Sequence, residues 1–172
     1  MDNLTEWRSL LKVFLLKSSG CSCQGVSAGL LADVDVLDKL TTDFITKYES
    51  VYGKLPLTQS DWVNNITALL FFMLDKINFG RFIGLFAVGK FVCQELLLSS
   101  TTWSMAHDLL FHKLALVLEV KIMPWLTSMG VGTFNELLGR HAGQVVQTRF
   151  FYFLKSMFVW ACMQLLDPWP FT

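Results

Sequence analysis

The chain has few charges and no excess of either sign. Only 16% of its 172 residues are charged, and 14 Lys and Arg balance 14 Asp and Glu. A nucleic-acid-binding domain presents a basic surface, and a disordered chain combines high charge with few apolar residues. Neither description fits a sequence that is 53% hydrophobic. The composition therefore predicts one folded domain over residues 1–172 that does not bind nucleic acid.

Cysteine and histidine are also scarce, with four and three residues. The cysteines are too few and too dispersed for a disulfide scaffold, so we expect reduced thiols in an intracellular protein. His107 and His112 are five residues apart, which does not suit one metal-binding helix face. No nucleophile–base pair, phosphate loop or pair of carboxylates is apparent. We therefore expect no metal, no cofactor and no enzymatic activity, and the charged start of the chain argues against a signal peptide.

Apolar residues recur at helical spacing along most of the chain, and prolines number only four. The pattern predicts a second helix that starts near Asp33 or Asp35, either of which can act as N-cap. It predicts a short helix capped by Thr133 and Glu136 that stops at Gly139. The helices expected on these grounds are residues 4–17, from about 33 or 35 to 53, 61–75, 82–98, 105–122 and 134–138.

The segment from Phe82 to Leu98 is apolar nearly all round. Such a helix is either surrounded by other helices or lies in a membrane. Arg81, Lys90 and Glu95 argue against lipid on every side, so we expect a buried central helix. Arg81 shares one helix face with Gly84, Leu85 and Val88, which suits a partner helix that carries one acidic residue in its apolar stripe.

The expected helices 61–75 and 105–122 differ in which of their side chains we expect to face solvent. In the helix 61–75, Phe71, Phe72 and Leu74 lie off the apolar stripe, and this surplus indicates either one wall of a groove or extra core contacts. In the helix 105–122, we expect the polar residues to mark its solvent side: His107, Asp108, His112, Lys113, Glu119 and Lys121.

The C-terminal segment 150–166 is strongly apolar but contains Lys155 and lacks basic flanks. At seventeen residues it is at the short limit for a membrane span. We favour a helix that packs on the domain, and a membrane-seeking tail stays open as the alternative.

Two motifs together resemble the Bcl-2 family of apoptosis regulators. Residues 75–81, Asp-Lys-Ile-Asn-Phe-Gly-Arg, resemble the first homology region, with Phe79 where tryptophan is usual. Pro124-Trp125-Leu126, Gly130 and residues 133–139 resemble the second region, with a bend one residue shorter. Residues 37–52 keep the apolar frame of the third region, but Thr41-Thr42 replaces its usual Gly-Asp. The compact size and this altered third region resemble viral members, especially gammaherpesvirus homologues.

The resemblance implies an all-α bundle of about eight helices around the central one. It implies an inhibitor of apoptosis that sequesters the death helix, which is the amphipathic third homology region of pro-apoptotic proteins. The expected partners are Bax-, Bak- and Bim-like proteins in the host-cell cytoplasm or at mitochondrial or other intracellular membranes, and binding of beclin stays open. The residues that would bind the partner helix are Arg81, Asn78, Gly80, Gly84, Phe44, Tyr48, Tyr52, Ala68, Phe72, Leu85 and Val88.

A pore-forming, pro-apoptotic protein of the same fold is the alternative function. Its apolar hairpin would be residues 79–123. The change to Thr41-Thr42 argues against it, because this change makes the second helix a poor death ligand and leaves it as a groove wall.

Overall fold

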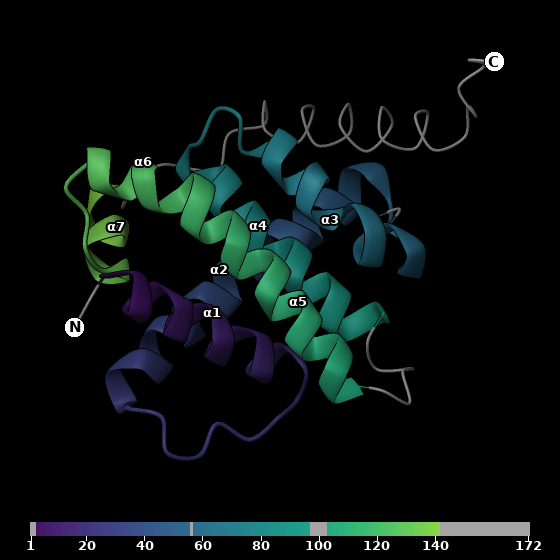
Figure 1. The fold of residues 1–172 in the computed structure, drawn as a ribbon, viewed down its shortest axis with the longest axis horizontal. Coiled ribbons are helices and arrows are strands. Elements are labelled where there is room, and N and C mark those ends of the chain that lie inside the picture. Colours follow the sequence, from purple (N-terminus) through teal and green to yellow (C-terminus); the bar gives the residue numbers. More distant parts are fainter. Residues whose placement is uncertain (1–2, 56, 97–102, 142–172) are drawn as a thin grey trace.

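The computed structural model describes residues 3–55, 57–96 and 103–141, and the elements in these ranges are all helical (Figure 1). The expectation of an all-α fold is therefore confirmed. Seven α-helices and two π-helical turns lie in the described ranges, against about eight helices expected, and the segment 150–166 lies outside them. The elements are α1 (Asn3–Ser18), α2 (Ala28–Tyr52), α3 (Gln59–Met73), α4 (Phe79–Phe91), η1 (Val92–Leu96), α5 (Trp103–Val117), η2 (Leu118–Ile122), α6 (Met123–Ser128) and α7 (Phe134–His141).

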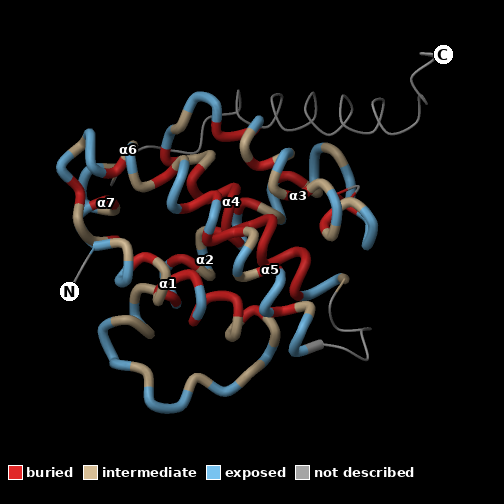
Figure 2. The backbone as a smooth tube through the Cα atoms, viewed as in Figure 1, coloured by how far each residue is buried: buried red, intermediate tan, exposed pale blue. Residues whose placement is uncertain are grey.

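Helix α4 lies at the centre of the bundle, as its all-round apolar sequence predicts. It contacts α1, α2 and α5, and every residue from Phe82 to Phe91 is buried (Figure 2). The helix begins at Phe79, is α-helical to Phe91 and continues as the π-helical turn η1 to Leu96, and the last two residues of the expected helix 82–98 lie outside the described residues. Among the described residues, no helix is long and apolar enough to cross a membrane.

An aromatic cluster joins α4 to the elements at the left of Figure 1. Phe82 is fully buried, and the ring of Trp7 from α1 meets it edge-on with 5.8 Å between centroids. Phe134 of α7 and Trp125 of α6 lie 6.4 and 6.2 Å from the Phe82 ring. The Trp7 indole N–H also donates to the carbonyl of Gly132 at 3.0 Å. These contacts explain why the two recognised motifs, although distant in sequence, form one packed unit.

Gly89 allows α4 to approach its neighbours closely, and this gives a first testable prediction. A Cβ at residue 89 would lie 2.8 Å from Leu114 Cδ1 and 3.0 Å from Leu15 Cδ2, two fully buried side chains. We expect Gly89→Val to destabilise the fold by about 1–3 kcal/mol in urea unfolding, because the core is overpacked. Gly29→Ala is the matched control: it meets nothing within 4 Å and should be neutral or slightly stabilising. Equal stability of the two variants would contradict this packing.

The start of α2 differs from the sequence prediction. The helix begins at Ala28, not near Asp33 or Asp35, and Ser27 is its N-cap. The Ser27 hydroxyl accepts a hydrogen bond from the Leu30 amide at 3.3 Å. The sequence hides this cap because Gly29, a poor helix former, follows it within the first turn. The end at Gly53, whose φ is +79°, agrees with the prediction.

Helix α3 starts two residues before the expected Asp61 and ends two before Asp75. Thr58 and Asp61 form a capping box, with the Thr58 amide donating to the Asp61 carboxylate at 2.9 Å. Of the two alternatives left open for Phe71, Phe72 and Leu74, extra core contacts hold for Leu74, whereas Phe72 is exposed. Leu74 is 1% exposed, because it leaves the helix as its C-cap and turns into the core.

Helix α7 has the predicted capping box but does not stop at Gly139. The Glu136 carboxylate accepts from the amides of Gly132 and Thr133, at 2.7 and 3.3 Å. The helix continues to His141, whose ring stacks on Phe79 with 4.8 Å between centroids. This contact stabilises a last turn that the glycine alone would not.

The expectation that His107 lies on the solvent side of the helix 105–122 is wrong. The side chain is 5% exposed and forms a hydrogen bond to the backbone of Leu15 in α1. Much of the solvent side of α5 and η2 is instead apolar, since Met105, Leu109, Leu116 and Val120 are exposed. Polar residues therefore do not by themselves mark the solvent side of this helix.

The burial of His107 predicts a loss of stability in mild acid. Burial lowers the pKa of His107 from its usual 6.5, and the bond to Leu15 opposes this only in part. The unfolded chain then binds the proton more readily, so stability is present above about pH 6.5 and is lost as the pH falls below it. We expect urea midpoints to decline between pH 7 and 5, and His107→Gln to reduce that decline. His112 is exposed, so the urea midpoint of His112→Gln should decline with pH as that of the parent does. Identical pH profiles for all three proteins would contradict the assignment to His107.

Candidate functional site

Arg81 lies in the first turn of α4, at one end of the buried helix. Asn78 is the N-cap, and its side-chain oxygen accepts from the Arg81 amide at 2.9 Å. The Arg81 guanidinium donates to the backbone carbonyl of Lys76 and is intermediate in exposure. Burial lowers the pKa of Arg81, while the nearby Asp75 carboxylate raises it. The N-cap and the loop before α4 thus orient an arginine that stays charged at neutral pH.

Helix α2, which contacts α4, carries three of the predicted binding residues. Phe44 and Tyr48 are buried, with 4% and 3% of their surfaces exposed, and Tyr52 is intermediate. The Tyr48 and Tyr52 rings lie 5.2 Å apart between centroids. The three residues are spaced by four, so they follow one face of α2.

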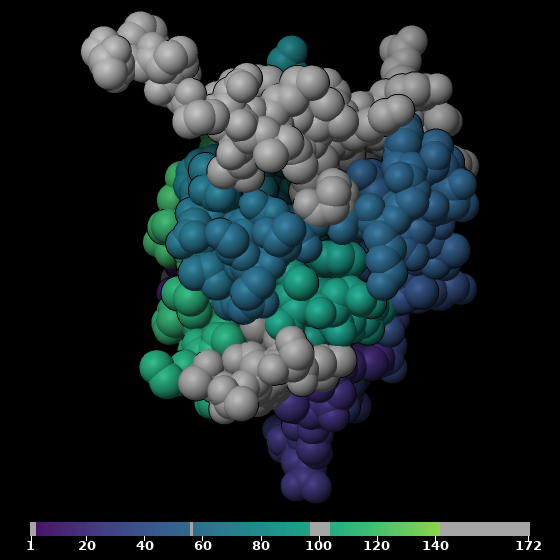
Figure 3. All heavy atoms as spheres, turned by 90° about the vertical axis from the view of Figure 1, so that its right-hand side faces the viewer, coloured from purple at the N-terminus to yellow at the C-terminus, as the bar shows by residue number. Residues whose placement is uncertain are grey.

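The other predicted residues come from α3 and α4 and differ widely in exposure. On α3, Ala68 and Phe72 are exposed and one turn apart, and Phe72 has 46% of its surface accessible. Gly80 is intermediate, and Asn78 is exposed. The remaining α4 residues are buried: Gly84, Leu85 and Val88. Figure 3 views the side of the molecule to which α2 and α3 both contribute surface.

A buried cation between α4 and α2 is a feature that the sequence reasoning missed. The Lys90 ammonium lies 2.7 Å from the Asp38 carboxylate and 2.7 Å from the Thr42 hydroxyl, and its side chain is 7% exposed. From the sequence, Lys90 serves only as an argument against lipid. Asp38 and Thr42 are one turn apart on α2, and Thr42 belongs to the pair that replaces Gly-Asp, but this spacing does not by itself link them to Lys90.

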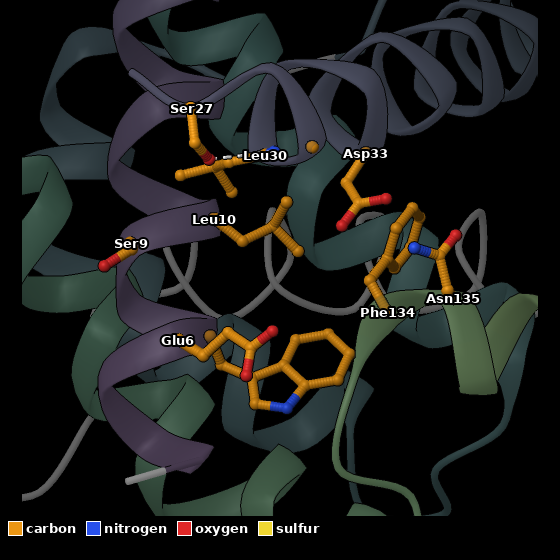
Figure 4. A pocket seen from close by; sticks show the side chains of 10 residues that line it. Glu6, Ser9, Leu10, Ser27, Leu30, Asp33, Phe134 and Asn135 are labelled. Carbon is orange, nitrogen blue, oxygen red and sulfur yellow. Dashed lines mark hydrogen bonds between the residues drawn. The ribbon is translucent and has the colours of Figure 1, made fainter. Parts of the chain in front are cut away.

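A separate pocket of about 480 Å³ lies between α1, the start of α2 and α7 (Figure 4). Buried apolar residues, Trp7, Leu10 and Phe134, form part of its wall, and Glu6 and Asp33 add carboxylates. Burial raises the pKa of Asp33, and a hydrogen bond from the Asn135 side chain opposes the shift. No predicted binding residue lines this pocket, so it is distinct from the α2–α3–α4 face.

The cysteines and the possible metal ligands of the described ranges were compared with what disulfide or metal sites need. Cys21, Cys23 and Cys93 are not in disulfides there, and burial raises the pKa of Cys93 to about 11, which keeps it a thiol at neutral pH. No group of three or more metal-ligating side chains is present among the described residues.

Comparison with known proteins decides the family. Residues 5–127 match the family described as apoptosis regulator M11, B cell 2 leukaemia/lymphoma like. The chain belongs to the Bcl-2 family. It is also 33% identical over 111 residues to an apoptosis regulator Bcl-2 homolog of Murid herpesvirus 4. That alignment covers 62% of this chain and 63% of the relative, so the chain spans less than two thirds of the relative's length.

The resemblance to a viral Bcl-2 homologue of the gammaherpesvirus type is thereby confirmed. The Bcl-2 family match covers the first homology region and the first residues of the second, Pro124 to Leu126. In the structure, the first region forms the capped start of α4. The second region forms α6 and α7, which pack on that start through Trp125, Phe134 and His141.

Proposed function

We propose that this Bcl-2 protein inhibits apoptosis by binding the death helix of pro-apoptotic family members against α2, α3 and α4. The observation that carries the proposal is Arg81. It is a charged residue at the start of a buried apolar helix, on the same face as Gly84, and a capped helix terminus fixes its backbone. A charge in that position suits an acidic residue within an otherwise apolar ligand.

The partner's aspartate would pair with Arg81, and its apolar anchors would contact the aromatic face of α2 and the exposed side of α3. Tyr52, which is partly exposed, would supply a rigid aromatic contact of the kind that dominates the energetics of many interfaces. Phe44 and Tyr48 are buried in the unbound chain and would contact the partner only where its binding exposes them. Gly80 and Gly84 would let the partner backbone approach α4. Asn78 would act mainly through Arg81, because its side-chain oxygen already caps the helix.

The resulting complexes would keep Bax- and Bak-like proteins from assembling and would sequester Bim-like activators. Binding of beclin-type autophagy proteins stays open as an alternative, and a panel of death-helix peptides would rank the partners. The protein would act inside the host cell, at or near the mitochondrial outer membrane.

Liposomes distinguish this function from pore formation by the same fold. We expect dye-loaded liposomes to remain intact with the full chain alone and to be protected by it from activated Bax. Dye release by the chain alone, at the concentrations where Bax acts, would favour the pore-forming alternative. Failure to protect, with intact liposomes, would contradict the inhibitory role.

A further inference from the structure

Lys90 is a charged residue in the most buried helix of the molecule. It lies in the last turn of α4, and its side chain is 7% exposed. Removing an ammonium group from water is costly unless acceptors replace its hydration shell. The surroundings of Lys90 must therefore compensate that cost, and the acceptors that do so come from a different helix.

The acceptors all belong to one turn of α2. Lys90 Nζ donates to Asp38 Oδ1 at 2.7 Å, to Thr42 Oγ1 at 2.7 Å and to the Asp38 carbonyl at 3.4 Å. An ammonium group has three donors, so its hydrogen-bonding capacity is matched. Because these bonds are directional, they fix both the height of α2 along α4 and its rotation about its own axis.

Thr42 is oriented for this contact. Its hydroxyl donates to the Asp38 carbonyl at 2.8 Å, which turns an oxygen lone pair toward Lys90. The second carboxylate oxygen of Asp38 lies 3.9 Å from Lys17 Nζ of α1, so the carboxylate also faces a second cation. The contact to Lys90 is much shorter and is the less exposed of the two.

We infer that Lys90, Asp38 and Thr42 form a polar clamp that positions α2 on α4. Apolar packing alone tolerates sliding and rotation of one helix on another, whereas a buried ion pair with a hydrogen-bonded hydroxyl specifies register. Phe44 and Tyr48 follow Thr42 on α2, so the clamp sets where these aromatic side chains lie. It also opposes release of α2, the segment that resembles the family's own death helix. The consequence for partner binding rests on the proposed function, while the clamp itself rests on the contacts above.

Hydrogen exchange of the full chain without any partner tests the clamp. We expect Lys90→Met to accelerate exchange of the amides in residues 37–52 by about tenfold or more, since a hydrogen bond to a charged group is lost. Thr42→Val should accelerate the same amides several-fold, and Thr42→Ser, which keeps the hydroxyl, should leave them unchanged. The exchange rates of the α3 amides should be unchanged in all of these variants. Lys54→Met removes an exposed ion pair to Glu95 and should have no effect on α2.

Two results would overturn the clamp. One is unchanged exchange in residues 37–52 in both Lys90→Met and Thr42→Val. The other is equal acceleration in α1, α2 and α3, which would mean a general loss of stability rather than release of α2. If Lys90→Met does not fold, the pair Thr42→Val and Thr42→Ser decides alone. Because no partner is present, this result is independent of whether death helices bind.

Discussion

Replacement of Arg81 with alanine should weaken binding of a Bim-type death-helix peptide by about 2–5 kcal/mol, which is roughly thirtyfold to several-thousandfold in Kd. The complex would leave the partner's aspartate without its counter-charge in a desolvated interface. The structure supports a fixed position for this charge, since Asn78 caps the turn that carries Arg81 and the guanidinium bonds to the Lys76 carbonyl.

Isothermal titration calorimetry of the full chain measures the effect. Lys76→Ala is the matched control, because it removes an exposed cation close to Arg81 and should alter affinity little. The melting temperature of Arg81→Ala should be measured in parallel, since the bond to the Lys76 carbonyl is lost. Unchanged affinity in a folded variant would remove the proposed salt bridge.

The second large effect is expected at Gly84, one turn after Arg81 on the same face of α4. Glutamate there would occupy the space that the partner backbone needs and would compete for the Arg81 guanidinium. We expect Gly84→Glu to abolish measurable binding of the same peptide, and the domain to keep its helical circular dichroism and a cooperative melt.

Gly139→Glu is the matched control for Gly84→Glu. Gly139 is an exposed helical glycine, and a Cβ there would meet nothing within 4 Å, so the same new charge should leave binding unaffected. Gly84 itself is buried. If Gly84→Glu collapses the helical signal, the residue belongs to the core and not to the binding face; Gly84→Ala then tests the steric part alone.

The helices that carry the candidate site are predictable because their signals are local. A run that is apolar except for Lys90 identifies α4 as the central helix, and Thr133 with Glu136 identifies the start of α7 through a four-residue hydrogen-bond pattern. The position of Arg81 follows from the same reasoning, since the residues before a buried helix are its N-terminal turn. Each of these inferences needs only neighbouring residues.

The features that the sequence does not reveal depend on contacts between distant segments. His107 is buried because α1 supplies a backbone acceptor, and α7 extends past Gly139 because His141 stacks on Phe79. Lys90 is compensated by residues about fifty positions earlier in the chain. Periodicity describes one helix at a time, and it does not reveal which polar group another helix will place opposite a buried charge.

For the predicted binding residues too, the sequence predicts some features and not others. Spacing alone puts Phe44, Tyr48 and Tyr52 on one face of α2, and the helix is continuous through them. Their degree of burial is not predictable from spacing, because it depends on the neighbouring elements. The wide range of exposure, from fully buried Leu85 to exposed Phe72, is likewise beyond a pattern of apolar residues.

Titration of the unaltered full chain with a Bim-type death-helix peptide tests the central claim most directly. We expect saturable one-to-one binding with a Kd on the order of 1 μM or tighter. Replacing the peptide's aspartate with alanine should weaken its binding to the parent chain at least about thirtyfold. The same replacement should leave the affinity for the Arg81→Ala chain unchanged. Absence of binding at roughly 100 μM peptide, with the chain folded, would contradict the account.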